Sequence, residues 1–516
     1  MNGAQLLLKT AVKSGVDMCF ANPGTTELPI VAALDDARGI RPILCLFEGV
    51  CAGAADGYGR MSGKPAMTLL HLGPGLCYGL ANLHNARRAR TPVLVVVGEH
   101  ATWHRGADPP LAMDMGALAA TVSGWQRTCQ SAGLLSRDTT EALETAQRGK
   151  VATLMVPHDV QWTDCGAPPI REAHSTYDPV NVGAVMRAAN ILREHKKAAI
   201  ILGGRALRRN ALIHAARIRQ VTGCDLLSET LFAHMERGLG IPVIDRIPYF
   251  PEKAVAVLSR YQALILAGAN EPVAFFGYKD SPSRLLNTKQ VTCSIAEENE
   301  NPEDVLEHLA DAVGAAGALK GEGLVPGRRD RLNLPRGALT PEKAAATLVA
   351  LQPEGAIIVD ESVTSGSSYY RMAASAPPHS LLTLTGGALG QGMPCAVGAA
   401  LACPDRAVIN IEADGSAMYT VQALWTQARE SLNVTTLICS NRRYEILTVE
   451  MARSGHDSLG PAAVALTDIG SPSIDWSEIA AASGVPAIAV TTAEQLAVEL
   501  KKAISEPGPH LIEMIF

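Results

Sequence analysis

The sequence lacks the features that mark several broad classes of protein. No apolar stretch is long enough to cross a bilayer, and the first residues, MNGAQLLLKTAVKSG, predict an amphipathic helix rather than a signal peptide. Basic runs are missing and the formal net charge is −6, which argues against a nucleic-acid partner. The eleven cysteines include no CxxC pair, and several, such as Cys45 and Cys439, lie in apolar runs. Such cysteines are typical of a reduced compartment, so we expect a cytoplasmic protein without a membrane partner.

The length and the order of apolar runs predict the fold class. A chain of 516 residues is too long for one core, and 47% hydrophobic with 19% charged residues is ordinary for a globular protein. Buried strands alternate with helical stretches in three regions, which indicates an α/β protein with three doubly wound parallel-sheet domains. We expect these domains at 1–168, 180–318 and 338–516, separated by linkers around 166–169 and 316–340, both rich in Gly and Pro.

One stretch, residues 406–446, predicts a ligand site. Residues 406–412 form an apolar run, 419–430 have a helical pattern, and 434–439 form a second apolar run, which together predict a βαβ unit. Asp414 and Asn441 then follow two parallel strands, at the edge where open α/β sheets bind ligands. A carboxylate, an amide oxygen and the backbone carbonyl of Arg443 are ligands that suit Mg²⁺ beside a diphosphate. The alternative is an ordinary Asx turn after each strand.

The same residues resemble a known cofactor motif. Asp414-Gly415-Ser416, followed by a helix, a strand and Asn441-x-x-Tyr444, is similar to the GDGS…NN motif of thiamine diphosphate (ThDP) enzymes, at the family's spacing. Ala413 and Ser440 depart from that motif. The resemblance implies that Asp414, Asn441 and the Arg443 carbonyl bind Mg²⁺. It also implies that ThDP is contacted by Gly415, Ser416 and Tyr444.

A second segment, FEGVCAGAADGYGRMSGKP, predicts the residue that activates the cofactor. Residues 43–47 predict a strand that ends at Glu48, and residues 50–60 predict a helix rich in small residues. The segment resembles the E-x4-A-D-G-Y-A-R-x-x-G-K-P motif of the same family. In that family the glutamate hydrogen-bonds the aminopyrimidine of ThDP and so promotes proton removal from thiazolium C2. The alternative is an acid that interacts favourably with the start of a helix.

His71 and Thr25 are the other candidate catalytic residues. His71 ends an apolar run, 66–70, beside a Gly-Pro-Gly turn, and its segment TLLHLGPG resembles the benzoylformate decarboxylase branch, where a histidine moves protons on the covalent adduct. Acetolactate synthases lack this histidine. Thr25, in NPGTTELP, aligns with a serine that contacts the substrate carboxylate. A core histidine and an ordinary turn are the alternatives. His100 and His104 are possible pocket residues.

The segment TGGALGQGMP, residues 385–394, resembles the family stretch that holds ThDP bent. Leu389 aligns with the bulky apolar residue that props the cofactor into its V shape, and Gly387 lies in the same turn. The alternative is a buried leucine in a glycine-rich turn. Glu361 and Ser362 follow a strand predicted at 357–359, and we expect them to line the pyrimidine side.

The resemblance covers the whole chain and implies a function. We expect a ThDP- and Mg²⁺-dependent 2-oxo acid decarboxylase, similar to benzoylformate decarboxylase, whose enamine intermediate is protonated or ligated to a second carbonyl. The alternatives are an acetolactate synthase-like carboligase and a non-catalytic ThDP-fold subunit. The middle region shows neither G-x-G-x-x-G nor an FAD signature, which disfavours the biosynthetic acetolactate synthases. The family further implies a homo-oligomer, at least a dimer and by expectation a tetramer.

Overall fold

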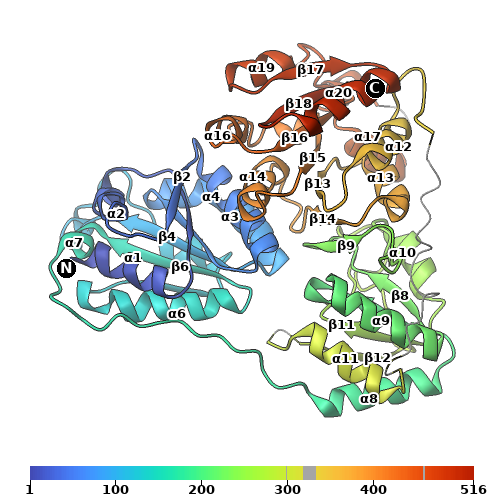
Figure 1. Cartoon of the computed structure of the whole chain (residues 1–516), viewed down its shortest axis with the longest axis horizontal. Helices are drawn as coiled ribbons and strands as arrows, with labels where there is room; N and C mark the ends of the chain where they lie inside the picture. The colour runs from blue at the N-terminus through green and yellow to red at the C-terminus, as the bar shows by residue number, and fades with distance from the viewer. Residues whose placement is uncertain (298, 316, 318–332, 457–458) are drawn as a thin grey trace. The chain divides into compact units, whose positions relative to one another are not determined.

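The computed structural model of the chain separates into two compact units (Figure 1). It describes residues 1–297, 299–315, 317, 333–456 and 459–516. The first unit comprises 1–175, 332–372 and 384–516, and the second comprises 176–331 and 373–383. Most of the linker expected at 316–340 lies outside the described residues. Within the described part of the chain, no helix is both long and apolar enough to span a membrane.

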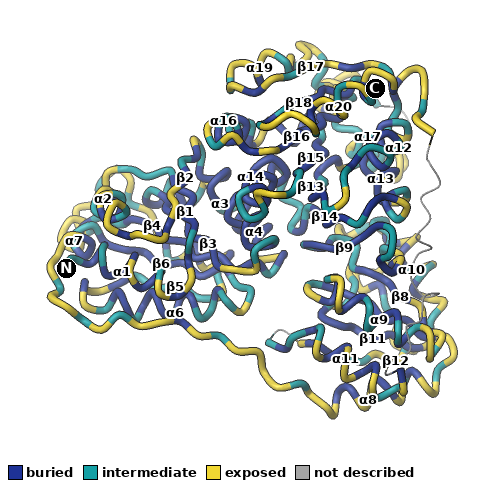
Figure 2. The backbone as a smooth tube through the Cα atoms, in the orientation of Figure 1, coloured by how far each residue is buried: buried dark blue, intermediate teal, exposed yellow. Residues whose placement is uncertain are grey.

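The N-terminal part of the first unit is a parallel sheet in the order β2-β1-β3-β4-β6-β5. Apolar β-branched runs build its centre, and β3 and β6 are buried at every residue (Figure 2). Its strands are β1 (Met18–Ala21), β2 (Arg41–Leu44), β3 (Ala66–Leu70), β4 (Val93–Glu99), β5 (Trp125–Thr128) and β6 (Val151–Pro157). Its helices are α1 (Gly3–Lys13), α2 (Leu28–Leu34), α3 (Glu48–Ser62), α4 (Leu72–Ala89), α5 (Met115–Ala120), α6 (Leu135–Gln147) and α7 (His158–Trp162).

The C-terminal part of the first unit contains a second parallel arrangement, β17-β18-β16-β15-β13. These strands are β13 (Ile357–Glu361), β15 (Val408–Ala413), β16 (Val434–Ser440), β17 (Ala487–Val490) and β18 (His510–Ile515). The helices are α12 (Pro341–Leu351), α13 (Ser367–Met372), α14 (Gly392–Ala402), α15 (Asp414–Ala417), α16 (Ala423–Arg429), α17 (Glu445–Arg453), α18 (Pro461–Ala465), α19 (Trp476–Ala482) and α20 (Ala493–Ser505). Several helices begin at a side-chain cap, as α20 does at Thr492.

The two parts of the first unit meet where α3 packs on α14 (Figure 1). Both helices are rich in small residues, and their backbones touch at two glycines. A Cβ at Gly57 would lie 2.0 Å from the carbonyl oxygen of Cys395, and one at Gly398 would lie 1.9 Å from that of Ala54. Glycine is therefore required on both sides of this contact. The small-residue segment after Glu48 serves a close helix–helix contact within one chain.

The second unit is a smaller α/β body whose main sheet has the order β10-β8-β7-β11-β12, with parallel neighbours. Its other strand pair, β9 with β14, is antiparallel. The strands are β7 (Ala198–Leu202), β8 (Asp225–Ser228), β9 (Met235–Arg237), β10 (Asp245–Arg246), β11 (Ala263–Ala267), β12 (Val291–Ile295) and β14 (His379–Thr383). The helices are α8 (Val182–Glu194), α9 (Arg209–Thr222), α10 (Pro251–Leu258) and α11 (Pro302–Ala312). The α/β class with three mainly parallel sheets is confirmed.

Two boundaries near the candidate site differ from those expected. The strand expected at 43–47 ends at Leu44, because residues 45–47 leave the sheet to start α3 at Glu48. The helix expected at 419–430 begins only at Ala423. Its first residues are held elsewhere, since the Thr420 hydroxyl donates to the Gly390 carbonyl at 2.9 Å, and such a tertiary contact overrides helix propensity.

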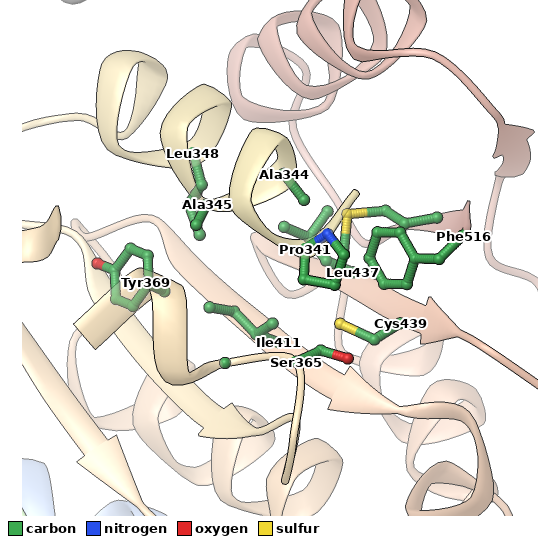
Figure 3. A pocket seen from close by; sticks show the side chains of 12 residues that line it. Pro341, Ala344, Ala345, Leu348, Ser365, Tyr369, Ile411, Leu437, Cys439 and Phe516 are labelled. Atoms are coloured by element: carbon green, nitrogen blue, oxygen red, sulfur yellow. The ribbon is translucent and has the colours of Figure 1, made fainter. Parts of the chain in front are cut away.

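A small apolar cavity of about 20 Å³ lies among α12, α13 and the strands β15 and β16 (Figure 3). Ile411, Leu437 and Cys439 contribute from the strands, and Ser365 is among the few polar groups there. A buried water needs two to four polar partners, so an apolar cavity of this size stays dry. It is a packing gap behind the strands rather than a place for a substrate.

Candidate active site

Asp414 and Asn441 lie beyond the ends of two neighbouring strands. β15 and β16 are parallel, and Ala413 is paired with Cys439, so the next residues of both strands leave the sheet at the same edge. The Asp414 carboxylate accepts from the backbone N–H of Arg442 at 2.7 Å and from that of Gly415 at 2.8 Å. The expected βαβ unit is therefore present and brings these side chains to one edge.

The groups at this edge fit a hard cation. Asp414 is 4% exposed, and burial raises the pKa of its carboxyl, while backbone N–H groups act in the opposite direction. A bound cation would stabilise the ionised form of this carboxylate. The Asn441 amide oxygen accepts from the Arg443 N–H at 3.2 Å, which is the Asx turn of the alternative interpretation. The Asx turn leaves Asn441 able to serve as a metal ligand as well, because an amide oxygen has two lone pairs.

Glycine at position 415 is required by the ring of Tyr444. A Cβ at Gly415 would lie 2.4 Å from Cε1 of Tyr444, so the ring covers the start of α15 closely. Ser416 is 3% exposed in the same short helix. These three residues, predicted to contact ThDP, lie together next to Asp414.

The glycine-rich turn at 385–392 is the second part of the site. Gly387 and Gly390 have φ of 78° and 87°, a left-handed conformation that favours glycine, and half-buried Leu389 lies between them. Glu361 holds the turn, because its carboxylate accepts from the N–H groups of Gly390, at 2.7 Å, and of Gly392. Glu361 thus contacts the backbone of the turn that carries Leu389.

Glu412 is a buried acid that the sequence analysis did not identify. It is fully buried next to Glu361, and Asn410 donates to its Oε2 at 3.0 Å. Burial raises the pKa of both carboxyls, and the charge of Glu361 raises that of Glu412 further. Two adjacent carboxylates cannot both ionise easily in a buried place. The one signal in the sequence is an acid within the apolar strand β15.

The N-terminal sheet brings three predicted residues to one edge. β2, β1 and β3 are neighbours, and their carboxyl ends lead to Glu48, to Thr25 and to His71 respectively. Glu48 is the first residue of α3 and is 6% exposed. No hydrogen bond to its carboxylate is found among the described residues. A Cβ at Gly75 would lie 2.8 Å from its Oε1, so this glycine leaves the carboxylate room. Glu48 is thus available to a ligand.

His71 is paired with Glu27, an acid that the sequence analysis missed. His71 Nδ1 donates to Glu27 Oε2 at 2.8 Å, and Glu27 is fully buried. Two glycines make room for the pair: a Cβ at Gly24 would lie 2.3 Å from His71 Nδ1, and one at Gly98 would lie 1.7 Å from Glu27 Oε1. The signal in the sequence is an acid followed by Leu-Pro in the NPGTTELP segment.

The pairing with Glu27 favours the charged form of His71. The hydrogen bond that His71 donates to the Glu27 carboxylate raises the pKa of His71 above its ordinary value, although burial opposes this shift. The side chain of His71 is 25% exposed, so its free Nε2 can reach a ligand. The raised pKa favours the protonated form of this imidazole, which can donate a proton.

The other residues expected near this edge are placed as follows. Thr25 is exposed, and the hydroxyl that lies 3.3 Å from His71 Nδ1 belongs to its neighbour Thr26. His100 and His104 lie together, with ring centroids 5.6 Å apart, after β4. The edge therefore combines the carboxylate of Glu48, the imidazole of His71 and hydroxyl groups.

Known proteins match the whole chain. A model of the thiamine pyrophosphate enzyme N-terminal TPP binding domain matches residues 1–123, and a model of the C-terminal TPP binding domain matches residues 363–514. Thiamine pyrophosphate is another name for ThDP. The chain is 49% identical, over 100% of its length and 99% of the relative, to the "Putative acetolactate synthase large subunit IlvX" of Mycobacterium tuberculosis.

Two further matches are named as decarboxylases. The chain is 30% identical to the benzoylformate decarboxylase of Pseudomonas aeruginosa, over 97% of this chain and 96% of that protein. Its fold matches the solved ThDP-dependent 4-hydroxybenzoylformate decarboxylase of Rhodococcus jostii RHA1 with a TM-score of 0.86 and 24% identity, over 99% of this chain and 98% of that one. The chain belongs to the thiamine pyrophosphate enzyme family, in the branch of decarboxylases and acetolactate synthases.

Proposed function

We propose that this chain is a ThDP- and Mg²⁺-dependent 2-oxo acid decarboxylase. The observation that supports this reaction is the Glu27–His71 pair, with Nδ1 and Oε2 at 2.8 Å and a raised pKa of the imidazole. Decarboxylation has to end with a proton delivered to carbon, and a partly exposed imidazole with a raised pKa is a suitable donor.

Residues of the C-terminal part hold the cofactor. Bound ThDP supplies a nucleophilic carbon and an electron sink, which no side chain can offer. Asp414, Asn441 and the Arg443 carbonyl would hold Mg²⁺, which neutralises the diphosphate. Leu389, on the turn that Glu361 fixes, would support the cofactor from one side.

Residues of the N-terminal part move the protons. The Glu48 carboxylate would hold the aminopyrimidine of bound ThDP by a hydrogen bond and act as the group that accepts and returns its proton. His71 Nε2 delivers a proton to the product carbon, and Glu27 stabilises the imidazolium until then. The exposed Thr25 hydroxyl donates a hydrogen bond to the substrate carboxylate before CO₂ leaves. The substrate class is a 2-oxo acid that reaches the start of α3, where Glu48 lies.

An acetolactate synthase-like carboligase is the second candidate. The 49% identity to a relative with that name favours it. The two functions differ in the last step of the reaction. A carboligase joins the intermediate to a second carbonyl compound, whereas a decarboxylase protonates it. Incubation with pyruvate and analysis of the product distinguishes acetaldehyde from acetolactate.

Replacing His71 with alanine should lower the turnover of a 2-oxo acid by about 10²–10⁴-fold, the usual contribution of a positioned acid or base. The affinity for ThDP should stay near normal, because His71 acts on the substrate. Acid-quench NMR of the cofactor should show that the covalent adduct accumulates before the blocked proton step. The substrates to screen are pyruvate, benzoylformate and branched 2-oxo acids.

The pH profile and a matched variant complete this test. Glu27→Gln keeps the shape of the partner but removes the charge that raises the pKa of His71. The wild-type rate falls as pH rises through this raised pKa, so the fall should begin at lower pH in Glu27→Gln. Full turnover by His71→Ala, with acetolactate formed from pyruvate, would favour the carboligase instead.

We also propose that the active form is at least a dimer, with Glu48 and Asp414 around one cofactor supplied by different subunits. Glu48→Gln and Asp414→Ala proteins are each expected to be inactive. Mixing them under conditions of subunit exchange should restore part of the activity, because some sites then receive both intact residues. The specific activity of the mixture, compared with each variant alone, measures this.

The control for this experiment is the same mixture kept below the temperature of subunit exchange, which should stay inactive. In one chain, the carbonyls of Gly49 and Gly390 both accept hydrogen bonds from Asn82, so a site built within one chain is a concrete alternative. An exchanged mixture that remains as inactive as its components would support that alternative and contradict our proposal.

A further inference from the structure

Two buried asparagines of α4, Asn82 and Asn85, are fixed to the turn that carries Leu389. Their side chains are 1% and 0% exposed and are three residues apart, so they lie on one face of the helix. They are joined directly, because Asn85 Nδ2 donates to Asn82 Oδ1 at 2.9 Å. Neither contacts a group that the proposed reaction uses.

Asn85 binds the residues before Leu389. Its Oδ1 accepts from the N–H of Gly386 at 3.1 Å and from that of Ala388 at 3.3 Å, and its Nδ2 donates to the Ala388 carbonyl at 2.8 Å. All four hydrogen-bonding positions of the amide are thus used. The reversed amide would place Nδ2 against two N–H donors, so the network fixes its orientation. A Cβ at Gly386 would lie 2.6 Å from Oδ1, which shows how closely the turn approaches.

Asn82 binds the residue after Leu389 and also the helix that starts with Glu48. Its Nδ2 donates to the Gly390 carbonyl at 3.1 Å and to the Gly49 carbonyl at 2.8 Å. One amide therefore sets the distance between the start of α3 and the turn. Leu389 is held on both sides, through residues 388 and 390, by the two asparagines.

We infer that Asn82 and Asn85 are positioning residues that fix Leu389, and with it the bent shape of bound ThDP, against helix α4 of the same chain. This inference rests on the proposed use of ThDP. The turn contains four glycines and would otherwise have many accessible conformations. A displacement of about 1 Å at a reacting centre can reduce a rate by about 10²-fold. The asparagines prevent such a displacement without touching the cofactor's diphosphate.

The experiment compares Asn85→Ala, Asn82→Ala and the wild type in three measurements. Hydrogen–deuterium exchange at C2 of bound ThDP should slow by about 10²-fold in Asn85→Ala and by less in Asn82→Ala, which loses fewer bonds. The dissociation constant for ThDP should rise in both. Mg²⁺-pyrophosphate probes only the diphosphate site around Asp414. Its dissociation constant should change less than about twofold, because strand β15, which positions Asp414, is unaltered.

The matched control is Gln352→Ala. Gln352 is also a buried amide of the first unit, 1% exposed, and its Oε1 accepts from the Tyr369 hydroxyl at 2.7 Å. Its loss should lower Tm while C2 exchange stays at the wild-type rate. If Asn85→Ala fails to fold, Asn82→Ala gives the answer. Wild-type exchange in a folded asparagine variant, or equal losses of ThDP and pyrophosphate affinity, overturns the inference. A wild type without ThDP-dependent exchange would instead contradict the proposed function.

Discussion

Replacing Asp414 with alanine is expected to abolish ThDP binding at ordinary Mg²⁺ concentrations while the fold persists. The buried carboxylate is the one charged group among the three proposed ligands, and its strand-end position is set by β15 and β16. Loss of an outer-shell partner alone weakens metal binding by about 10–100-fold, so loss of a direct ligand should exceed about 100-fold. Titration with ThDP at fixed Mg²⁺, followed by circular dichroism or calorimetry, measures this.

Asp414→Asn separates the charge from the local structure. It retains an oxygen that can accept from the Arg442 N–H, so the turn at 441–443 should survive. Its ThDP affinity should still be low, and high Mg²⁺ should restore part of it. Undiminished ThDP affinity in Asp414→Ala would show that the cation is bound elsewhere or is not needed.

Replacing Glu48 with glutamine should slow hydrogen–deuterium exchange at C2 of bound ThDP by about 10²–10⁴-fold while ThDP still binds. The substitution keeps the shape of the side chain, and Gly75 leaves room for either group. The lost charge is what favours the reactive tautomer of the aminopyrimidine. Quenched-exchange NMR of the C2 proton measures the rate directly.

Glu342→Gln is the matched control for Glu48→Gln. Glu342 is also in the first turn of a helix, α12, where its carboxylate accepts from Ser368 Oγ at 3.3 Å, so its substitution removes the favourable interaction of an acid with a helix start. Both variants should lose a little thermal stability, and only Glu48→Gln should lose C2 exchange. If Glu48→Gln exchanged at the wild-type rate, Glu48 would be no more than a helix-start acid.

The sheet edge that carries Asp414 and Asn441 could be predicted from the sequence, because it depends on a local sequence pattern. Asp414 and Asn441 belong to one βαβ unit, and the parallel pairing of its strands follows from the usual handedness of such units. Their proximity therefore required no knowledge of distant contacts. The exact starts of β15 and of α16 were less predictable, since Thr420 is held by Gly390, thirty residues earlier.

The Glu27–His71 pair could not be predicted, because it depends on the order of strands in a sheet. Glu27 follows β1 and His71 follows β3, and only the placement of β3 beside β1 brings them together. Nothing in the spacing of the two residues specifies that order. The role of Glu361 was hidden for a similar reason: the sequence places it at a strand end, but its partners, Gly390 and Gly392, are about thirty residues away.

The contact between α3 and α14 restricts how this chain can change in evolution. Gly57 and Gly398 face backbone carbonyls at distances that no Cβ can occupy, so one added methyl group on either helix would force the helices apart. Neither position can drift alone, and no compensating substitution on the facing helix is available, because the obstacle is main chain. A recombinant that joins the first half of this chain to the second half of a relative would therefore keep its architecture only if both parents contributed glycine at these sites.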